Sequence, residues 1–216
     1  MSRPFRNRKE AGEQLAKALL RFRDENPIVL GLARGGIVVA EPVARALGAP
    51  LDPLVARKVG APKHPEFGMG AVAPGGVRYA NPETLQMLGM SEADFDRYAR
   101  REEAEVQRRL DAYLGGRSMT RLAGRCAILV DDGLATGVTA VAATRYVRSQ
   151  RPASTVMAVP VASHQGMDLL SREVDEVVSL LVPEAFYAVG QWYEDFAQTS
   201  DEEVVSMLMK QHATLE

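Results

Sequence analysis

Hydrophobic and polar residues recur along the chain with two different spacings. Short, nearly continuous apolar runs at 28–33, 126–130 and 154–162 predict buried strands, because such runs are typical of parallel sheets covered on both faces. Apolar residues spaced three and four apart predict helices between these runs. Further elements follow the same patterns, with helices at 9–23, 37–47, 91–114, 139–148 and 164–172 and strands at 51–59, 77–80 and 174–182.

The alternation of strands and helices predicts an α/β fold with a mostly parallel, doubly wound sheet. We expect residues 1–216 to form a single domain, with residues 81–117 as a helical insertion and residues 183–216 as a C-terminal segment. The stretch "GAPKHPEFGMGAVAPGG" is rich in glycine and proline, so residues 59–75 are predicted to form a long mobile loop.

Composition and charge exclude several classes of protein. The 216-residue chain has a net charge of −2, so no overall positive field draws it to nucleic acid or to an anionic membrane. No apolar run approaches the roughly 18 residues that a membrane-spanning helix needs, and the basic N-terminus lacks the apolar core of a secretory signal. Cys126, the single cysteine, excludes an intrachain disulfide. These features predict a cytoplasmic protein.

The candidate chemistry lies in the stretch "AILVDDGLATGVTA", residues 127–140. An apolar strand ends on Asp131 and Asp132, and a loop of glycine and hydroxyl residues then leads into a helix. Ligands of open parallel sheets bind beyond the carboxyl ends of the strands, and the amides at a helix start bind phosphate. Two carboxylates beside a phosphate cradle suit a ribose 5-phosphate. The alternative interpretation is a pair of aspartates that only caps the helix.

Other phosphate-binding motifs are absent from the sequence. There is no G-x-x-x-x-G-K-[ST] segment, and the glycines of "GLARGG" (31–36) do not match G-x-G-x-x-G. A P-loop and a dinucleotide fingerprint are therefore excluded.

The stretch "ILVDDGLATGVT" resembles the phosphoribosyl-diphosphate (PRPP) signature of type I phosphoribosyltransferases, although Gly133 stands where many members carry an aliphatic residue. "GLARGG" resembles the pyrophosphate loop of that family, and "VARKVGAP" resembles its second strand running into a catalytic flexible loop. The similarity covers residues 28–75 and 125–182. It implies a Rossmann-like sheet with a C-terminal hood, and transfer of the phosphoribosyl group from PRPP to a nucleobase or similar nitrogen heterocycle with release of pyrophosphate.

The resemblance also implies a role for individual residues. Catalytic roles fall on Asp131, Asp132, Arg57 and Lys58. The residues implied to bind the 5-phosphate are Gly133, Leu134, Ala135, Thr136, Gly137 and Thr139. Those implied to bind the pyrophosphate are Ala33, Arg34, Gly35 and Gly36, and a cis peptide bond is expected at Ala33–Arg34. The residues implied to bind the base are Phe186, Tyr187 and Trp192. Mg²⁺ is the implied cofactor, held by Asp131 and Asp132 directly or through water.

Several alternatives remain open. The expected partners are PRPP and a nucleobase, with a homodimer through the charged helix 91–114 as a further option. A non-catalytic regulator that binds PRPP or a nucleotide is one rival, and an enzyme of another phosphosugar is a second. Arg34 and the glycine-rich loop favour an enzyme, because a sensor has no need to shield a reactive cation from water. The C-terminal aromatic residues either stack on the base or pin the chain end to the core.

Overall fold

The computed structural model describes residues 4–62 and 64–213, and its centre is a sheet of five parallel strands in the order β2-β1-β6-β7-β8. The strands are β1 (Pro27–Leu32), β2 (Leu51–Leu54), β6 (Cys126–Val130), β7 (Ser154–Val161) and β8 (Glu176–Leu181). From β1 the chain winds outward to β2, and from β6 it winds the other way to β7 and β8. The predicted doubly wound α/β fold is confirmed, and the direction of winding reverses between β1 and β6.

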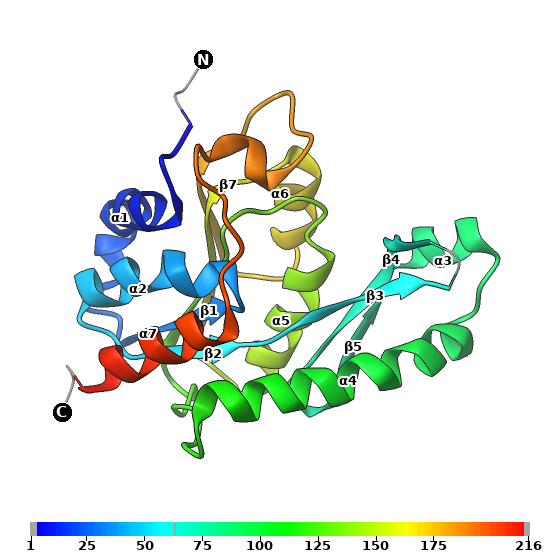
Figure 1. The fold of residues 1–216 in the computed structure, drawn as a ribbon, viewed down its shortest axis with the longest axis horizontal. Coiled ribbons are helices and arrows are strands. Elements are labelled where there is room, and N and C mark those ends of the chain that lie inside the picture. The colour runs from blue at the N-terminus through cyan, green and yellow to red at the C-terminus, as the bar shows by residue number, and fades with distance from the viewer. Residues whose placement is uncertain (1–3, 63, 214–216) are drawn as a thin grey trace.

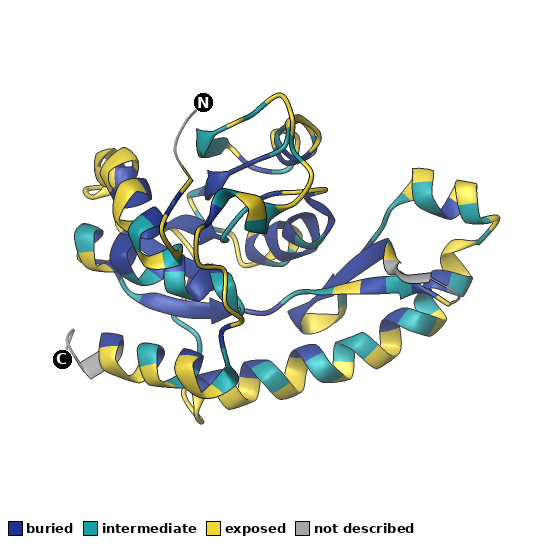
Figure 2. Ribbon diagram, turned by 45° about the horizontal axis from the view of Figure 1, so that its top comes forward, coloured by how far each residue is buried: buried dark blue, intermediate teal, exposed yellow. Residues whose placement is uncertain are grey.

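Helices cover both faces of this sheet (Figure 1). One face carries α1 (Arg8–Leu19), α2 (Gly35–Leu47) and α7 (Asp201–Ala213), and the other carries α5 (Val138–Ser149) and α6 (His164–Leu170). Alternate residues of a strand join opposite cores, as Val29 and Ile28 of β1 do. The central strands are buried along their length (Figure 2). Short 3₁₀ turns lie at Leu20–Phe22, Pro74–Gly76 and Val189–Trp192.

A second, antiparallel sheet corrects two predictions. The expected strand 51–59 is two strands, because β2 ends at Leu54 and β3 (Arg57–Ala61) belongs to the other sheet. Most of the expected loop 59–75 is also strand, since β3 pairs with β4 (His64–Ala73) and β4 with β5 (Val77–Ala80). Lys63 and the chain ends of the predicted single domain, 1–3 and 214–216, lie outside the described residues. Figure 1 shows this sheet projecting away from the main one.

The long helix α4 (Glu92–Leu114) runs beneath both sheets, after the shorter α3 (Pro82–Leu88) (Figure 1). The predicted helix 91–114 is confirmed, and Ser91 and Asp94 form its capping box. Ion pairs from β3 and β5 tie the second sheet to α4, including Arg57–Glu102 and Arg78–Glu103. No helix in the described ranges is both long and apolar enough to cross a membrane.

Candidate active site

Asp131 and Asp132 follow β6 at the point where the winding of the sheet reverses. The Asp131 Oδ1 atom accepts a hydrogen bond of 2.8 Å from the Asp132 amide. Burial raises the pKa of the Asp131 carboxyl well above its ordinary value, and the charge of Asp132 raises it further. Burial also raises the pKa of Asp132, although the neighbouring Arg8 opposes that shift. Two carboxylates are thus held together where their charges are costly, which is typical of a site that binds a ligand.

The loop after β1 packs directly on these carboxylates. A Cβ atom added to Gly35 would overlap the Asp132 carboxylate, and one added to Gly36 would lie 3.0 Å from Asp131 Oδ1. Glycine is therefore required at both positions for the two loops to meet. The peptide bond Ala33–Arg34 is cis, as the family resemblance implied. The Arg34 Nη1 atom lies 3.7 Å from Asp201 Oδ1 at the start of α7.

The loop after the aspartates leads into α5 through Gly137, its N-cap residue. Leu134 is buried and its amide donates to the Val161 carbonyl at 2.9 Å, so this amide already has an acceptor. Within the described chain, no protein acceptor is assigned to the amides of residues 135–139. The Thr136 side chain is exposed and that of Thr139 is half-buried. These amides lie at a helix start beside the two carboxylates and are free to bind an anion, and we call residues 135–139 the anion cradle.

Gly133 begins this loop, and the structure explains its departure from the family pattern. The side chain of Val189 occupies the space that a Cβ atom at Gly133 would need. The Val189 side chain of the C-terminal segment thus fills the space beside Gly133.

Arg57 and Lys58 lie on β3, apart from the aspartates in the sequence and in the sheet. The Arg57 Nε atom pairs with Glu102 Oε2 of α4 at 2.5 Å. Lys58 is exposed, and its aliphatic stem packs against Gly68 of β4. Both residues line a cavity of about 610 Å³ that also reaches Thr139 of the anion cradle. Both residues therefore border the same cavity as Thr139, although Arg57 is also part of the ion pair that holds α4.

Arg8, which no sequence motif marks, is the first residue of α1. Its Nε atom is 2.7 Å from Asp132 Oδ2, and the two side chains are only 11% and 16% exposed. Its Nη1 atom donates to the Ala197 carbonyl at 2.8 Å, and its guanidinium lies 3.7 Å from the centre of the Phe196 ring. Arg8 thus links the C-terminal segment after β8 to the Asp132 carboxylate. An arginine at the start of an amphipathic helix matches no motif, so the sequence alone does not indicate this contact.

The C-terminal segment contributes packing to the site. The Tyr193 hydroxyl donates to the Asp132 carbonyl, and its ring lies 5.6 Å from Phe5 and 5.0 Å from Phe196. Burial raises the pKa of this hydroxyl, and the negative charge of Asp132 raises it further. For Tyr193 and Phe196, the interpretation as packing residues is the one that the structure supports.

The three predicted base-binding residues do not form one cluster. Trp192 is half-buried against the group formed by Phe5, Ala11 and Tyr193, and its indole Nε1 atom is buried with no acceptor among the described residues. Phe186 is half-buried, outside the hydrophobic clusters. Tyr187 is 88% exposed. Of the three, Phe186 and Tyr187 remain accessible for a ligand, and Trp192 has a packing role.

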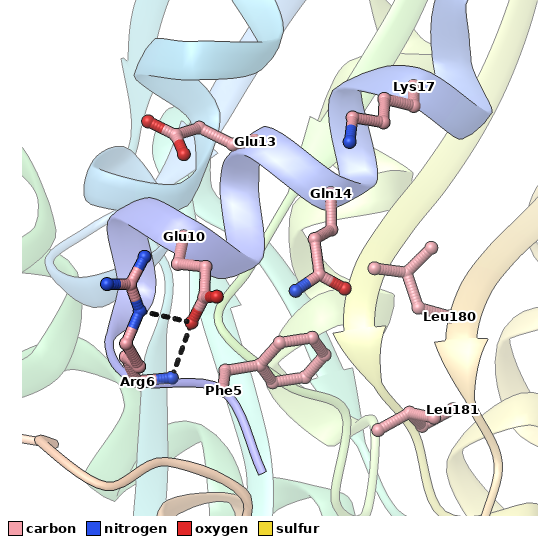
Figure 3. Close-up of a pocket in the computed structure, with 8 residues that line it drawn as sticks. All are labelled: Phe5, Arg6, Glu10, Glu13, Gln14, Lys17, Leu180 and Leu181. Atoms are coloured by element: carbon pink, nitrogen blue, oxygen red, sulfur yellow. Dashed lines mark hydrogen bonds and ion pairs between the residues drawn. The ribbon is translucent and has the colours of Figure 1, made fainter. Parts of the chain in front are cut away.

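A separate cavity of about 600 Å³ lies between α1 and the end of β8, with Phe5 at its edge (Figure 3). Arg6 and Lys17 balance Glu10 and Glu13 in its lining, and Arg6 pairs with Glu10 at 3.3 Å. The described residues that line it include none of the predicted site residues. This cavity therefore offers neither the charge excess nor the carboxylates of the site after β6.

The carboxylates of Asp131 and Asp132 supply only some of the oxygen ligands that a cation such as Mg²⁺ needs. No cluster of three or more His, Cys, Asp or Glu side chains in the described part of the chain is placed to hold a metal ion. Mg²⁺, however, commonly binds through one or two carboxylates together with water and substrate phosphates. Asp131 and Asp132 fit that mode, because each carboxylate has one oxygen outside the hydrogen bond and ion pair described above.

Comparisons with known proteins agree with this geometry. The chain is 43% identical over 208 residues to two Mycobacterium tuberculosis proteins, named "Putative phosphoribosyl transferase MT0597" (strain CDC 1551 / Oshkosh) and "Putative phosphoribosyl transferase Rv0571c" (strain ATCC 25618 / H37Rv). The alignment covers 96% of this chain and 47% of each relative, so the chain spans about half the length of these curated proteins.

Solved structures show the same fold. The crystal structure of TT1426 from Thermus thermophilus is 43% identical, with a TM-score of 0.81 over 96% of this chain and 99% of that one. The AQ2163 protein from Aquifex aeolicus shares the fold alone, at 14% identity and a TM-score of 0.50 over 80% of this chain and 73% of that one. The family model described as "Phosphoribosyl transferase domain" matches residues 6–196. Because this family model covers most of the chain, the chain belongs to the phosphoribosyl transferase family.

Proposed function

We propose that this chain transfers the 5-phosphoribosyl group of PRPP to a nucleobase or similar nitrogen heterocycle and releases pyrophosphate. The observation that carries the proposal is the meeting of three parts at one point. Asp131 and Asp132 lie against the loop 33–36, and the anion cradle 135–139 follows them directly. PRPP is a ligand with a need for each part, since it has a 5-phosphate, ribose hydroxyls and a diphosphate.

Each part has a distinct task in this reaction. The free amides of 135–139 and the hydroxyls of Thr136 and Thr139 bind the 5-phosphate. Asp131 and Asp132 accept hydrogen bonds from the ribose hydroxyls, and their negative charge stabilises the positive charge that develops on the sugar ring. Arg34 and the amides of Gly35 and Gly36 bind the diphosphate and stabilise it as it departs. The protein thus acts by positioning and by electrostatics.

Mg²⁺ is the cofactor that we propose, in line with the donors described above. When bound, it neutralises part of the diphosphate charge and helps to orient that group. Asp131 and Asp132 hold it, through water or directly, and the raised pKa of both carboxyls makes this binding sensitive to pH. We expect chelation of divalent cations to abolish turnover, and excess Mg²⁺ to restore it.

The acceptor binds beside the C-terminal segment, with Phe186 as the residue that stacks on it. Phe186→Ala is expected to raise the KM for the acceptor more than the KM for PRPP, because base stacking on an aromatic ring contributes about 1–3 kcal/mol. Steady-state kinetics measure both constants. Met87→Ala is the control, since this side chain is 65% exposed and lies on α3, outside the predicted site residues. Equal effects of Phe186→Ala on both constants would remove Phe186 from the acceptor site.

The first experiment is a thermal-unfolding titration with PRPP and Mg²⁺ beside ribose 5-phosphate and inorganic diphosphate. A ligand at 100 times its Kd stabilises the native state by about 2.7 kcal/mol, which is readily measured. We expect PRPP to raise the unfolding midpoint further than ribose 5-phosphate does. Release of diphosphate with a panel of heterocycles then identifies the acceptor.

The titration also separates the rival functions. Stabilisation by PRPP without turnover of any heterocycle would indicate a regulator that binds PRPP. Stabilisation by ribose 5-phosphate alone, with Arg34→Ala as active as the parent, would indicate an enzyme of another phosphosugar and would overturn the proposal.

A further inference from the structure

Asp201, the first residue of α7, contacts both α4 and the loop after β1. Its Oδ1 atom accepts a hydrogen bond of 2.6 Å from the Tyr113 hydroxyl of α4. The same oxygen lies 3.7 Å from Arg34 Nη1, which belongs to the loop that we assign to the diphosphate. Helix α7 packs against α2 and α4 (Figure 1), so the C-terminal helix reaches one of the two ligand loops of the site.

The Arg34 guanidinium has a single charged partner in the described part of the chain. Asp201 is the carboxylate within ion-pair distance, and at 3.7 Å the contact is longer than a hydrogen bond. Across residues 4–62 and 64–213, no protein group accepts a hydrogen bond from this guanidinium. Its N–H donors therefore remain available to a bound anion, and 26% of the side chain is exposed to receive one.

The Asp201 carboxylate is itself held in place by Tyr113, which is only 2% exposed. Burial raises the pKa of the Tyr113 hydroxyl, and the hydrogen bond to Asp201 raises it further, so the group stays protonated and donates. An acidic residue in the first turn of a helix is also stabilised by the helix dipole. The negative charge beside Arg34 is therefore fixed relative to the core.

A fixed carboxylate near an arginine can aid the binding of an anion or compete with it. An arginine loses rotamer freedom when it binds a ligand, and a charge that already restricts the guanidinium reduces that loss. Competition is weak here, because the Arg34 and Asp201 side chains are 26% and 40% exposed and share no hydrogen bond that a ligand must break. The contact therefore favours positioning of Arg34 over competition with its ligand.

We propose that Asp201 is a positioning residue that keeps the Arg34 guanidinium ordered for the diphosphate of PRPP, and that Tyr113 holds Asp201 in place for this task. The inference rests on the proposed function and deepens it, because it gives the C-terminal helix a task in binding the leaving group. Asp201 acts through Arg34 and does not touch the substrate. The 5-phosphate binds at the other loop, so its affinity should not depend on Asp201.

The test compares Asp201→Ala with Glu202→Ala in the full chain with Mg²⁺. Glu202 is the matched control, because it carries the same charge in the same turn of α7, is exposed, and lies outside ion-pair distance of Arg34. Inorganic diphosphate, PRPP and ribose 5-phosphate are titrated by calorimetry at constant ionic strength, with sulfate as a control for unspecific anion binding. Asp201→Ala is expected to weaken diphosphate and PRPP about fivefold, which corresponds to about 1 kcal/mol for the ordering of one long side chain. The affinity for ribose 5-phosphate should change by less than about twofold.

A double-mutant cycle separates positioning from a structural role. It uses PRPP, because the 5-phosphate keeps binding measurable without Arg34. In an Arg34→Ala background, Asp201→Ala should cause no further loss of PRPP affinity, since the residue through which it acts is gone. Tyr113→Phe removes the hydrogen bond to Asp201 but keeps the ring, and should reproduce part of the loss. A structural defect would instead lower the affinity equally in both backgrounds.

Equal diphosphate affinities of Asp201→Ala and Glu202→Ala would overturn the inference. Tighter binding in Asp201→Ala would also overturn it, because Asp201 would then be a competitor, as would a parent protein that binds diphosphate no better than sulfate. If the cycle holds but the parent transfers the phosphoribosyl group to no heterocycle, the positioning role stands and the proposed transferase function fails. If turnover is found while Asp201→Ala behaves as its control does, only the inference fails.

Discussion

Asp131 and Asp132 hold adjacent carboxylates where burial opposes their ionisation. A buried carboxyl with a raised pKa binds its proton more tightly in the folded chain than in the unfolded chain. Its contribution to stability is therefore greatest at pH values below the ordinary aspartate pKa of about 3.9. That contribution falls as the pH rises through the raised pKa of the folded state. The two residues reduce the stability of the ligand-free protein at neutral pH, as expected of groups retained for binding.

Asp131→Asn should accordingly stabilise the ligand-free protein at pH 7 while it abolishes turnover. Each 1 kcal/mol corresponds to a rise of about 2–4 °C in Tm for a chain of this size. The gain should shrink as the pH approaches about 4, where the parent carboxyl becomes protonated in both states. Thermal unfolding of both proteins between these pH values measures the difference.

Asp175→Asn is a control of opposite sign for that experiment. Hydrogen bonds from Thr155 lower the pKa of Asp175, so this carboxylate stabilises the fold above its unfolded pKa and the benefit is lost as the pH falls. The variant should unfold at a lower temperature than the parent at pH 7. A loss of stability in Asp131→Asn at pH 7 would contradict the burial argument.

Arg8 favours the ionised form of Asp132, and its removal should change the pH dependence of binding. Arg8→Met is expected to raise the pKa of Asp132 and to move the acid limb of PRPP binding to higher pH. Isothermal titration across pH measures this limb. Arg6→Met is the matched control, because its side chain is 68% exposed and pairs with Glu10. An unchanged profile in Arg8→Met would show that Arg8 only holds the chain ends together.

At the scale of elements, the apolar runs predicted the central sheet well because parallel strands must be apolar on both faces. In the second sheet, the strand at 77–80 was predicted, but β4 was mistaken for a loop for a physical reason. In β4, Gly70 lies directly against the Phe95 ring of α4, where a side chain would clash. Glycine has a low strand propensity, so a strand that accepts a helix closely has the composition of a loop. The partner that requires the glycine lies in another element, and the local sequence does not reveal it.

The contact between the loop after β6 and the C-terminal segment gives a prediction at this scale. Gly133→Ala places a methyl group where the Val189 side chain lies, and should cost about 1–3 kcal/mol as overpacking does. Chemical denaturation measures the loss. Val189→Ala in the same chain should restore most of it, because it vacates the space. Equal losses in the single and double variants would mean that the strain lies elsewhere.

At the scale of the whole molecule, the two motif loops of the site were predictable from the sequence, but the contacts that cover Asp132 were not. "GLARGG" and "VDDGLATGVT" carry local signals for phosphate binding, and the fold brings both to one place. Arg8 and Tyr193 reach Asp132 from opposite ends of the sequence, and neither belongs to a motif. Such contacts depend on how distant segments pack, so they become visible only with the fold.

The terminal helix α7 contributes to the stability of the whole domain. Leu208 is fully buried in the core on the α1 and α2 side of the sheet, and Leu208→Ala should cost about 2–5 kcal/mol. Met209 is 68% exposed, so Met209→Ala should unfold as the parent does. Denaturant unfolding distinguishes the two. A small cost for Leu208→Ala would mean that α7 is only loosely attached.

The contacts that Arg8 and Tyr193 make with Asp132 join residues that are translated at very different times. The five strands of the main sheet have all been translated once residue 181 is made, but the segment with Tyr193 and Ala197 follows later. Contacts between residues far apart in sequence also close slowly, because the loop entropy must be overcome first. A chain truncated between residues 181 and 193 would therefore contain the sequence of all five strands but lack the Tyr193 and Ala197 contacts around Asp132 and Arg8.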